Sequence, residues 1–280
     1  HPDRDQQWHR RHPGPADRAL MKELIRLALP VAVSNLGLML MGLVDLMAVG
    51  RLGAEAMSAV GLGVSISAWG LTIGIGALGG LDFLASSSLG AGRPERGRTA
   101  FQQVWRGVFV LGMPAVALII LSGYALEAFG IPAQVAASTR EFLVPISLSL
   151  IPAWAFHASR QMLQAHQRTR AVLASLVVGN VSNLAGNIFW VAGAFGFTSY
   201  GVVASAWVTL GARILMCAVT LAALYRLDPQ AWKKQVSVSA DESRENRKRL
   251  VSLGIPGALQ MALEVGVFSV STILATRLGI

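Results

Sequence analysis

The chain has 280 residues, of which 53% are hydrophobic and only 14% are charged, and its mean hydropathy is +0.53. Because ordinary globular chains carry about 25% charged residues, this composition excludes an ordinary water-soluble domain. The formal net charge of +9 does not indicate a nucleic-acid-binding protein, because the lysines and arginines lie in the gaps between apolar runs.

Residues 1–23 are polar and contain prolines, and they have no apolar core, so we expect a flexible tail and not a signal peptide. Seven apolar runs follow, each long enough to cross about 30 Å of hydrocarbon. A lone apolar strand could not satisfy its backbone in lipid, so each run is predicted to be a helix. The predicted spans are 27–49, 57–89, 99–121, 142–163, 171–195, 202–225 and 250–278.

The basic residues gather at alternate ends of these spans. The N-terminal tail and the second, fourth and sixth gaps are rich in lysine and arginine, whereas the first, third and fifth gaps carry few or none. Basic loops mark the cytoplasmic side of a membrane protein. The pattern therefore predicts an integral membrane protein with its N-terminus in the cytoplasm.

The last span resembles the first. When Pro30 is aligned with Pro256, a constant shift of 226 positions also aligns RLG at Arg51 with RLG at Arg277. Six spans separate the copies, so both would run in the same direction, as in a parallel repeat. We expect a six-helix lobe at 24–226, a cytoplasmic linker at 227–248, and the first helix of a second, truncated lobe at 249–280. Shared helix composition without common descent is the alternative.

Three acidic residues lie within apolar runs: Asp45, Asp82 and Glu264. A carboxylate at mid-bilayer costs about 2.5–3.5 kcal/mol, so such residues usually face a bundle interior and often carry ions or protons. We expect this coupling role for Asp45 and Glu264. An interfacial carboxylate is the alternative for Asp45, and a bond that ties helix ends together is the alternative for Asp82.

Asn180, Asn183 and Asn187 are spaced by three and four residues and share one helix face. They either form hydrogen bonds between helices or assist an acid in binding a cation or proton. Pro30 and Pro256 are expected to act as bending points. The sequence contains no nucleotide-binding loop, metal-ligand cluster or nucleophile arrangement, so we expect no enzymatic activity and no cofactor beyond a coupling ion.

Four stretches together resemble the multidrug and toxic compound extrusion (MATE) family. They are LALPVAVSNLGLMLMGLVDLMAVGRLG, ALGGLDFLASSSLGAG, NLAGN and LGIPGALQMALEVGVFSVSTILATRLG. The resemblance implies an all-α, polytopic transmembrane bundle of two six-helix lobes that open alternately and expel cationic, amphipathic drugs in exchange for Na⁺ or H⁺. It implies a bacterial inner-membrane monomer whose partners are lipid, small cations and a C-terminal lobe in cis, with no nucleic acid. Here one lobe and the seventh helix would be present.

By this resemblance Asp45 is the acid of the first helix, and Asn183 and Asn187 are a polar pair of the fifth. Thr209 matches a small polar position in the sixth helix, and Glu264 matches the acid found in the seventh helix of the NorM-like branch. We therefore expect these residues to take part in ion coupling and substrate binding, with Asn180 beside them.

The chain also departs from the family pattern. Asn187 stands where some members have aspartate, which leaves this lobe with one carboxylate fewer. Asp82 matches the acid that family motifs place near the end of the second helix. Two rival functions stay open: a flippase for lipid-linked precursors, which needs a strongly basic cavity, and a truncated membrane protein that does not transport.

Overall fold

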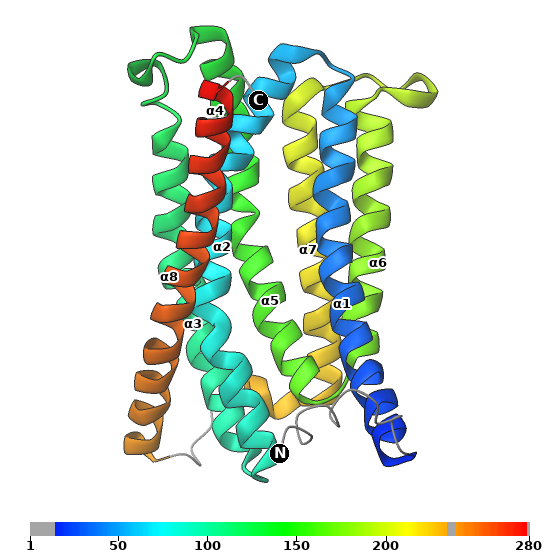
Figure 1. The fold of residues 1–280 in the computed structure, drawn as a ribbon, viewed down its shortest axis with the longest axis vertical. Helices are drawn as coiled ribbons and strands as arrows, with labels where there is room; N and C mark the ends of the chain where they lie inside the picture. The colour runs from blue at the N-terminus through cyan, green and yellow to red at the C-terminus, as the bar shows by residue number, and fades with distance from the viewer. Residues whose placement is uncertain (1–14, 234–238, 279–280) are drawn as a thin grey trace, which may run out of the picture.

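The computed structural model describes residues 15–233 and 239–278, and the side chains of 32–233 and 239–267. Within this part of the chain, seven helical segments are long and apolar enough to cross a membrane, and there is no strand. They stand side by side as an elongated bundle (Figure 1). The all-α transmembrane prediction is confirmed.

The helices follow the chain order of the predicted spans, with one span built from two helices. They are α1 (Pro15–Gly50), α2 (Ala54–Gly90), α3 (Pro94–Ser122), α4 (Ala133–Leu148), α5 (Leu150–Ala165), α6 (Thr169–Gly186), α7 (Gly201–Leu227) and α8 (Ala240–Leu278). Four short helical turns lie between them: η2 (Glu127–Phe129), η3 (Asn187–Val191), η4 (Ala194–Gly196) and η5 (Pro229–Trp232).

Two helices begin earlier than hydropathy indicated. α1 starts at Pro15, inside the range expected to be a tail, and α8 starts at Ala240, inside the range expected to be a linker. The apolar run of α1 starts only at Leu27, so its first twelve residues are more polar. Hydropathy detects where a helix enters lipid, whereas polar residues can extend the same helix beyond the hydrocarbon.

The fourth span is interrupted at Ser149, which separates α4 from α5. Pro152 has no backbone N–H, so it cannot donate to the carbonyl of Leu148 four residues earlier. The hydroxyl of Ser149 donates to the carbonyl of Ile146 at 2.6 Å. The break therefore lies inside the bundle, where Ser149 is fully buried.

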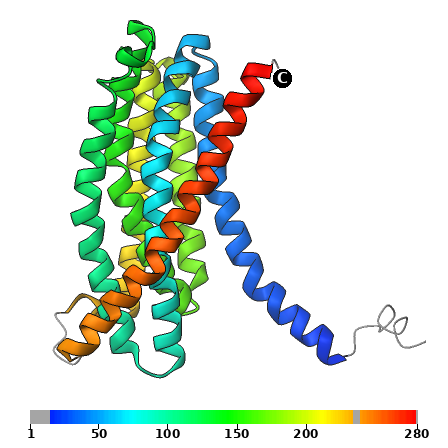
Figure 2. The same cartoon turned by 60° about the vertical axis from the view of Figure 1, so that its left-hand side comes forward.

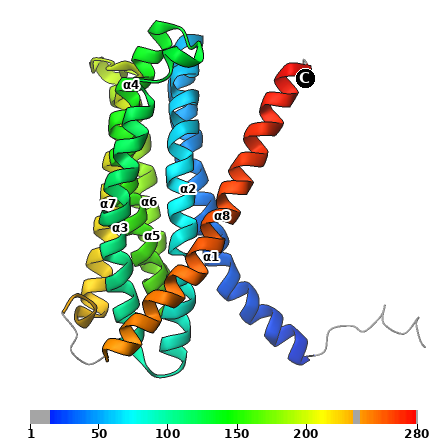
Figure 3. The same ribbon diagram turned by 90° about the vertical axis from the view of Figure 1, so that its left-hand side faces the viewer.

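α1 and α8 run in the same direction, as a parallel repeat requires (Figure 1). Figures 2 and 3 show α8 crossing α2 obliquely and leaning away from the lobe toward its C-terminal end. The other helices surround a core in which large side chains such as Phe101, Phe156 and Leu81 are almost fully buried. The repeat itself stays a prediction.

Glycines allow α8 to approach the backbone of α2. A Cβ atom on Gly257 would lie 2.5 Å from the carbonyl oxygen of Gly76, and one on Gly254 would lie 2.5 Å from that of Ala77. Both distances are far below van der Waals contact, so only glycine fits. Small residues of this kind drive helix association in membranes by permitting close packing.

The first turns of α8 are also bonded to α3. Arg96 lies 3.7 Å from a carboxylate oxygen of Glu242 and 3.3 Å from one of Glu245. The side-chain amide of Gln103 donates to the carbonyl of Ser243 at 2.9 Å. Polar bonds at one end and the glycine contact further along therefore attach α8 to the lobe.

A buried carboxylate organises the same end of the bundle. Asp228, which is 4% exposed, accepts a 2.7 Å hydrogen bond from Nε of Arg98. Nε2 of His166 lies 3.9 Å from the same carboxylate oxygen. Arg98 also donates to Gln230 at 2.7 Å. These contacts attach the segment after α7 to α3 and to the end of α5.

The glycine contact can be tested on one helix. We expect Gly76→Leu to destabilise the protein by about 1–3 kcal/mol, because overpacking forces α8 away from α2. Gly79→Leu is the control, since a Cβ atom there meets nothing within 4 Å. Reversible unfolding in detergent and spin-label distances between α2 and α8 would measure both effects. Equal stability and equal spin-label distances in the two variants would contradict the close contact between α2 and α8.

His166 predicts a pH dependence. Burial lowers the pKa of His166 below its usual 6.5, Asp228 partly opposes this, and Arg98 and Arg168 add to it. The unfolded chain then binds a proton more readily than the folded one, so stability should be complete above about pH 6.5 and fall as the pH drops below it. His166→Gln should flatten this slope, measured by thermal unfolding between pH 5 and 8. An unchanged slope would contradict the assignment.

Candidate ion-coupling site

The carboxylate of Asp45 lies where α1 passes α6 and α7. Its Oδ1 accepts hydrogen bonds of 2.8 Å from the side-chain amides of Asn183 and Asn187, and its Oδ2 accepts one of 2.7 Å from the hydroxyl of Thr209. The three donors are 0–3% exposed. Hydrogen bonds to a charged group are stronger than neutral ones, so this set stabilises the carboxylate where water is scarce.

Local sequence explains how these donors come together. Asn183 and Asn187 are four residues apart, so they lie one above the other on a single face of α6. Gly179 faces Met216, and Gly186 faces Val208, at distances that leave no room for a Cβ atom. α6 therefore packs close to α7, and Asn183 lies 3.5 Å from the hydroxyl of Thr209.

α6 changes its winding at the site. The turn η3 that begins at Asn187 is π-helical, and the N–H of Ala192 donates to the carbonyl of Asn187 five residues earlier, at 2.9 Å. Single π-helical turns often occur at functional sites, because the extra residue redirects side chains. Oδ1 of Asn187 is buried and accepts no hydrogen bond within the described residues.

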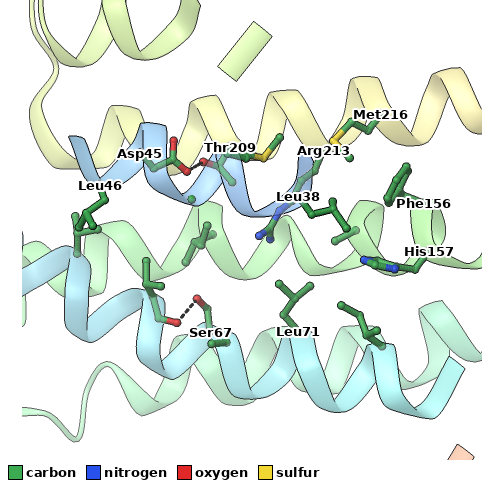
Figure 4. A pocket seen from close by; sticks show the side chains of 18 of the residues that line it. Leu38, Asp45, Leu46, Ser67, Leu71, Phe156, His157, Thr209, Arg213 and Met216 are labelled. Carbon is green, nitrogen blue, oxygen red and sulfur yellow. Dashed lines mark hydrogen bonds between the residues drawn. The ribbon is translucent and has the colours of Figure 1, made fainter. Parts of the chain in front are cut away.

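A cavity of about 420 Å³ borders Asp45, between α1, α2, α5 and α7. Figure 4 shows apolar walls that include Leu38, Leu71 and Phe156. Asp45 and Thr209 lie toward one end, His157 lies toward the other, and the guanidinium of Arg213 lies between them. Such a mostly apolar cavity with few convergent polar groups is typical of a small-molecule site.

Arg213 connects the cavity to the break between α4 and α5. It lies near enough to Asp45 for electrostatic attraction. Its guanidinium also donates a 2.6 Å hydrogen bond to the hydroxyl of Ser149. Arg213 lies midway along α7, and sequence reasoning assigned neither it nor His157 to the site. Their only signal was an isolated basic side chain within an apolar run.

The structure does not bring every predicted residue to this site. Asn180 donates instead to the carbonyl of Gly37 at 2.9 Å, which ties α6 to α1. Asp82 is exposed on α2 and interacts electrostatically with Arg160 of α5. Glu264 is exposed on α8 and does not line the cavity.

The two predicted bending points lie in different surroundings. Pro30 falls within α1, but its side chain lies outside the described residues. Pro256 is exposed on α8, between the two glycines that contact α2. Among the described residues, no group of histidine, cysteine or acidic side chains could hold a metal ion.

The MatE family model matches residues 30–189, which is more than half of the chain. The chain belongs to the MATE family. This region includes Asp45, Asn183 and Asn187, whereas Thr209 and Arg213 lie beyond it. The membership confirms the resemblance seen in the sequence motifs. The family is one of integral membrane transporters, not of enzymes.

Curated relatives agree with this membership. A probable multidrug resistance protein NorM of Bradyrhizobium diazoefficiens is 28% identical over 262 residues, covering 90% of this chain and 54% of the relative. Another of Caulobacter vibrioides is 32% identical over 193 residues, covering 68% and 41%. The chain thus spans about half the length of the curated relatives it matches.

Solved structures share the fold. The eukaryotic MATE transporter AtDTX14 aligns with a TM-score of 0.74 at 21% identity, covering 91% of this chain and 56% of that one. An outward-facing MATE transporter of the MOP superfamily aligns with a TM-score of 0.73 at 19% identity, covering 90% and 55%. These likenesses confirm the MATE-type helix arrangement.

A double-mutant cycle can test the bonds of Asp45. Asn187→Ala should destabilise the protein, and most of that cost should vanish in the Asp45→Asn background, giving a coupling of about 1–2 kcal/mol. Asn180→Ala is the control on the same helix, because Asn180 does not touch Asp45 and its effect should be additive. Reversible unfolding in detergent measures each variant. Equal coupling for both asparagines would contradict the geometry.

Proposed function

We propose that this chain serves as one lobe of a secondary active exporter, which expels amphipathic cations in exchange for H⁺ or Na⁺. The observation that carries the proposal is a carboxylate, Asp45, that is held by three donors at the edge of a mostly apolar cavity. Burying a carboxylate within the membrane is unfavourable in free energy, and such residues usually mark ion or proton pathways.

The chemistry of the site favours a proton as the coupling ion. All three partners donate to ionised Asp45, and on protonation of Oδ2 the hydroxyl of Thr209 can rotate and accept from the new O–H, so the site can hold both states. Sodium would need oxygen ligands, and the buried Oδ1 of Asn187 is one available atom. However, Asn187 supplies an amide and not a second carboxylate, so Asp45 would be the one anionic ligand of a sodium ion among these residues.

Arg213 could link the charge of Asp45 to the conformation of the α4–α5 boundary. With Asp45 ionised, Arg213 is balanced by the carboxylate and bonded to Ser149 at the α4–α5 break. Neutralising Asp45 removes the balancing charge, and an uncompensated charge in a low-dielectric interior is strongly unfavourable. The ion would thereby shift the balance between the two states, which is the differential binding that coupling requires.

The cavity suits an amphipathic cation. Its apolar walls would receive the hydrophobic part of a substrate, and the cationic group would compete with the coupling ion for Asp45. The curated relatives' names describe probable multidrug resistance proteins, which supports this substrate class. The mixed charge of Asp45 and Arg213 suits a flippase for lipid-linked pyrophosphates less well, because such a cavity should be strongly basic.

The proposal also assigns roles to further residues, a cellular location and partners. Glu264 would act as a second acid from α8, with Asp82 and the bending points Pro30 and Pro256 in the conformational change. The exporter would be a monomer in a bacterial inner membrane, with its N-terminus in the cytoplasm. Its partners would be lipid, small cationic substrates and a C-terminal lobe in cis, with no nucleic acid and no cofactor beyond the coupling ion.

Transport can be tested with the full-length gene product in proteoliposomes, under an imposed pH or Na⁺ gradient. Asp45→Asn should lower gradient-driven export of a fluorescent organic cation about 5- to 150-fold, the range of a typical coupling free energy. Glu55→Gln is the control for loss of an exposed carboxylate. Export without any gradient, or full activity of the Asp45→Asn, Glu264→Gln double variant, would contradict the proposal.

A further inference from the structure

A second hollow lies on the opposite face of α7 from the Asp45 cavity. It is an open groove of about 940 Å³ between α6 and α7, closed on one side by α4, and we call it the α6–α7 groove. Val208 and Gly211 face this groove, whereas Thr209 and Arg213 face the Asp45 cavity. The two hollows are therefore separate, and α7 forms a wall of each.

Aromatic rings from both helices converge on the groove. Trp190 follows α6, Tyr200 directly precedes α7, and Trp207 lies in its second turn. All three line the groove and are 48–65% exposed. Aromatic side chains are common at membrane interfaces, where they normally form a scattered belt. Here they gather around a concavity, which a belt does not require.

One carboxylate lines the same groove. Glu141 of α4 is exposed, and it makes no hydrogen bond or ion pair with any other residue that the structure describes, whereas its neighbour Arg140 pairs with Glu127 at 2.8 Å. α4 and α7 both begin at the upper end of Figure 1. Counting about 1.5 Å per residue places Glu141 and Trp207 at similar depths, about 9–12 Å from their helix starts.

We propose that the α6–α7 groove binds an amphipathic organic cation, with its ammonium group against Glu141 and the indole rings and its apolar part along α6 and α7. A carboxylate supplies the opposite charge, and indole faces attract cations through their quadrupole. A neutral lipid chain would fill the apolar groove but would leave Glu141 unmatched. An anionic ligand is disfavoured because it would be repelled by that carboxylate.

This chemistry has two sources: a free organic cation dissolved in the membrane, and a phospholipid whose headgroup carries an ammonium. Both would place a cation beside aromatic rings. The proposal concerns binding alone and uses none of the residues around Asp45. Its outcome is therefore independent of whether the chain takes part in ion-coupled transport.

The test uses this chain in nanodiscs of phosphatidylglycerol, which has no amine headgroup. The probe is an alkyltrimethylammonium carrying a diazirine, and labelled peptides are identified by mass spectrometry. We expect saturable labelling of α6 and α7 that unlabelled alkyltrimethylammonium displaces and an alcohol of the same chain length does not. Equal competition by the alcohol would overturn the proposal, because the groove would then recognise only apolar chains.

Two variants sharpen this test. Glu141→Gln keeps the side chain's size but removes its charge, and should weaken labelling about 1.5- to fivefold, as expected for a partly exposed ion pair. Glu55→Gln is the matched control, since Glu55 is also exposed but does not line the groove. Equal affinity of the two variants would overturn the proposal.

Gly211→Leu should block labelling by filling the groove, because a Cβ atom there meets nothing within 4 Å. Undiminished labelling of this variant would overturn the assignment of the groove. Repeating the assay in phosphatidylethanolamine separates the two sources. A lower apparent affinity for the probe identifies the lipid headgroup as a competing occupant, and an unchanged affinity identifies the free cation; both outcomes support an ammonium site.

Discussion

The organisation of this lobe depends on keeping one carboxylate hydrogen-bonded where water is scarce. Asp45 needs donors, and the hydrocarbon supplies none, so they must come from neighbouring helices. Asn183 and Asn187 provide two and Thr209 provides the third. These bonds hold α1 against both α6 and α7. The proposed coupling chemistry and the packing of the three helices therefore depend on the same hydrogen bonds.

Close helix approach is what makes those bonds short enough. Hydrophobic burial does not drive helices together in lipid, so small residues at the contact decide which helices meet. Gly179 and Gly186 bring α6 to α7 near the carboxylate, while Gly76 and Gly257 bring α8 to α2. The first contact sets the geometry of a site, and the second positions α8, the helix predicted to repeat α1.

The sequence predicted the parts of the structure that follow from hydropathy and helical period. Apolar length predicted the seven spans, and the spacing of four residues placed Asn183 and Asn187 on one face. The same spacing also grouped Asn180 with them, but a shared face does not name a partner, and Asn180 bonds the backbone of α1 at Gly37. Helix period describes one helix, whereas partners depend on how two helices cross.

The surroundings of Arg213 could not be predicted from the sequence. An arginine in an apolar run can reach toward the interface or face the interior, and hydropathy does not distinguish these. Its role depends on Ser149, 64 residues away in sequence, at the boundary between α4 and α5, where Pro152 cannot donate to the carbonyl of Leu148. The interruption of α4 and α5 is thus a consequence of local chemistry, and only the folded bundle reveals that it lies beside Arg213.

The position of α7 between two hollows follows from its sequence. Residues at 209, 213 and 216 face the Asp45 cavity, and those at 208, 211 and 215 face the α6–α7 groove, because steps of three and four keep each set on its own side. A rotation of α7 about its axis would therefore alter both hollows at once. Arg213 would resist such a rotation while Asp45 is charged, since the attraction to Asp45 and the bond to Ser149 both fix its direction.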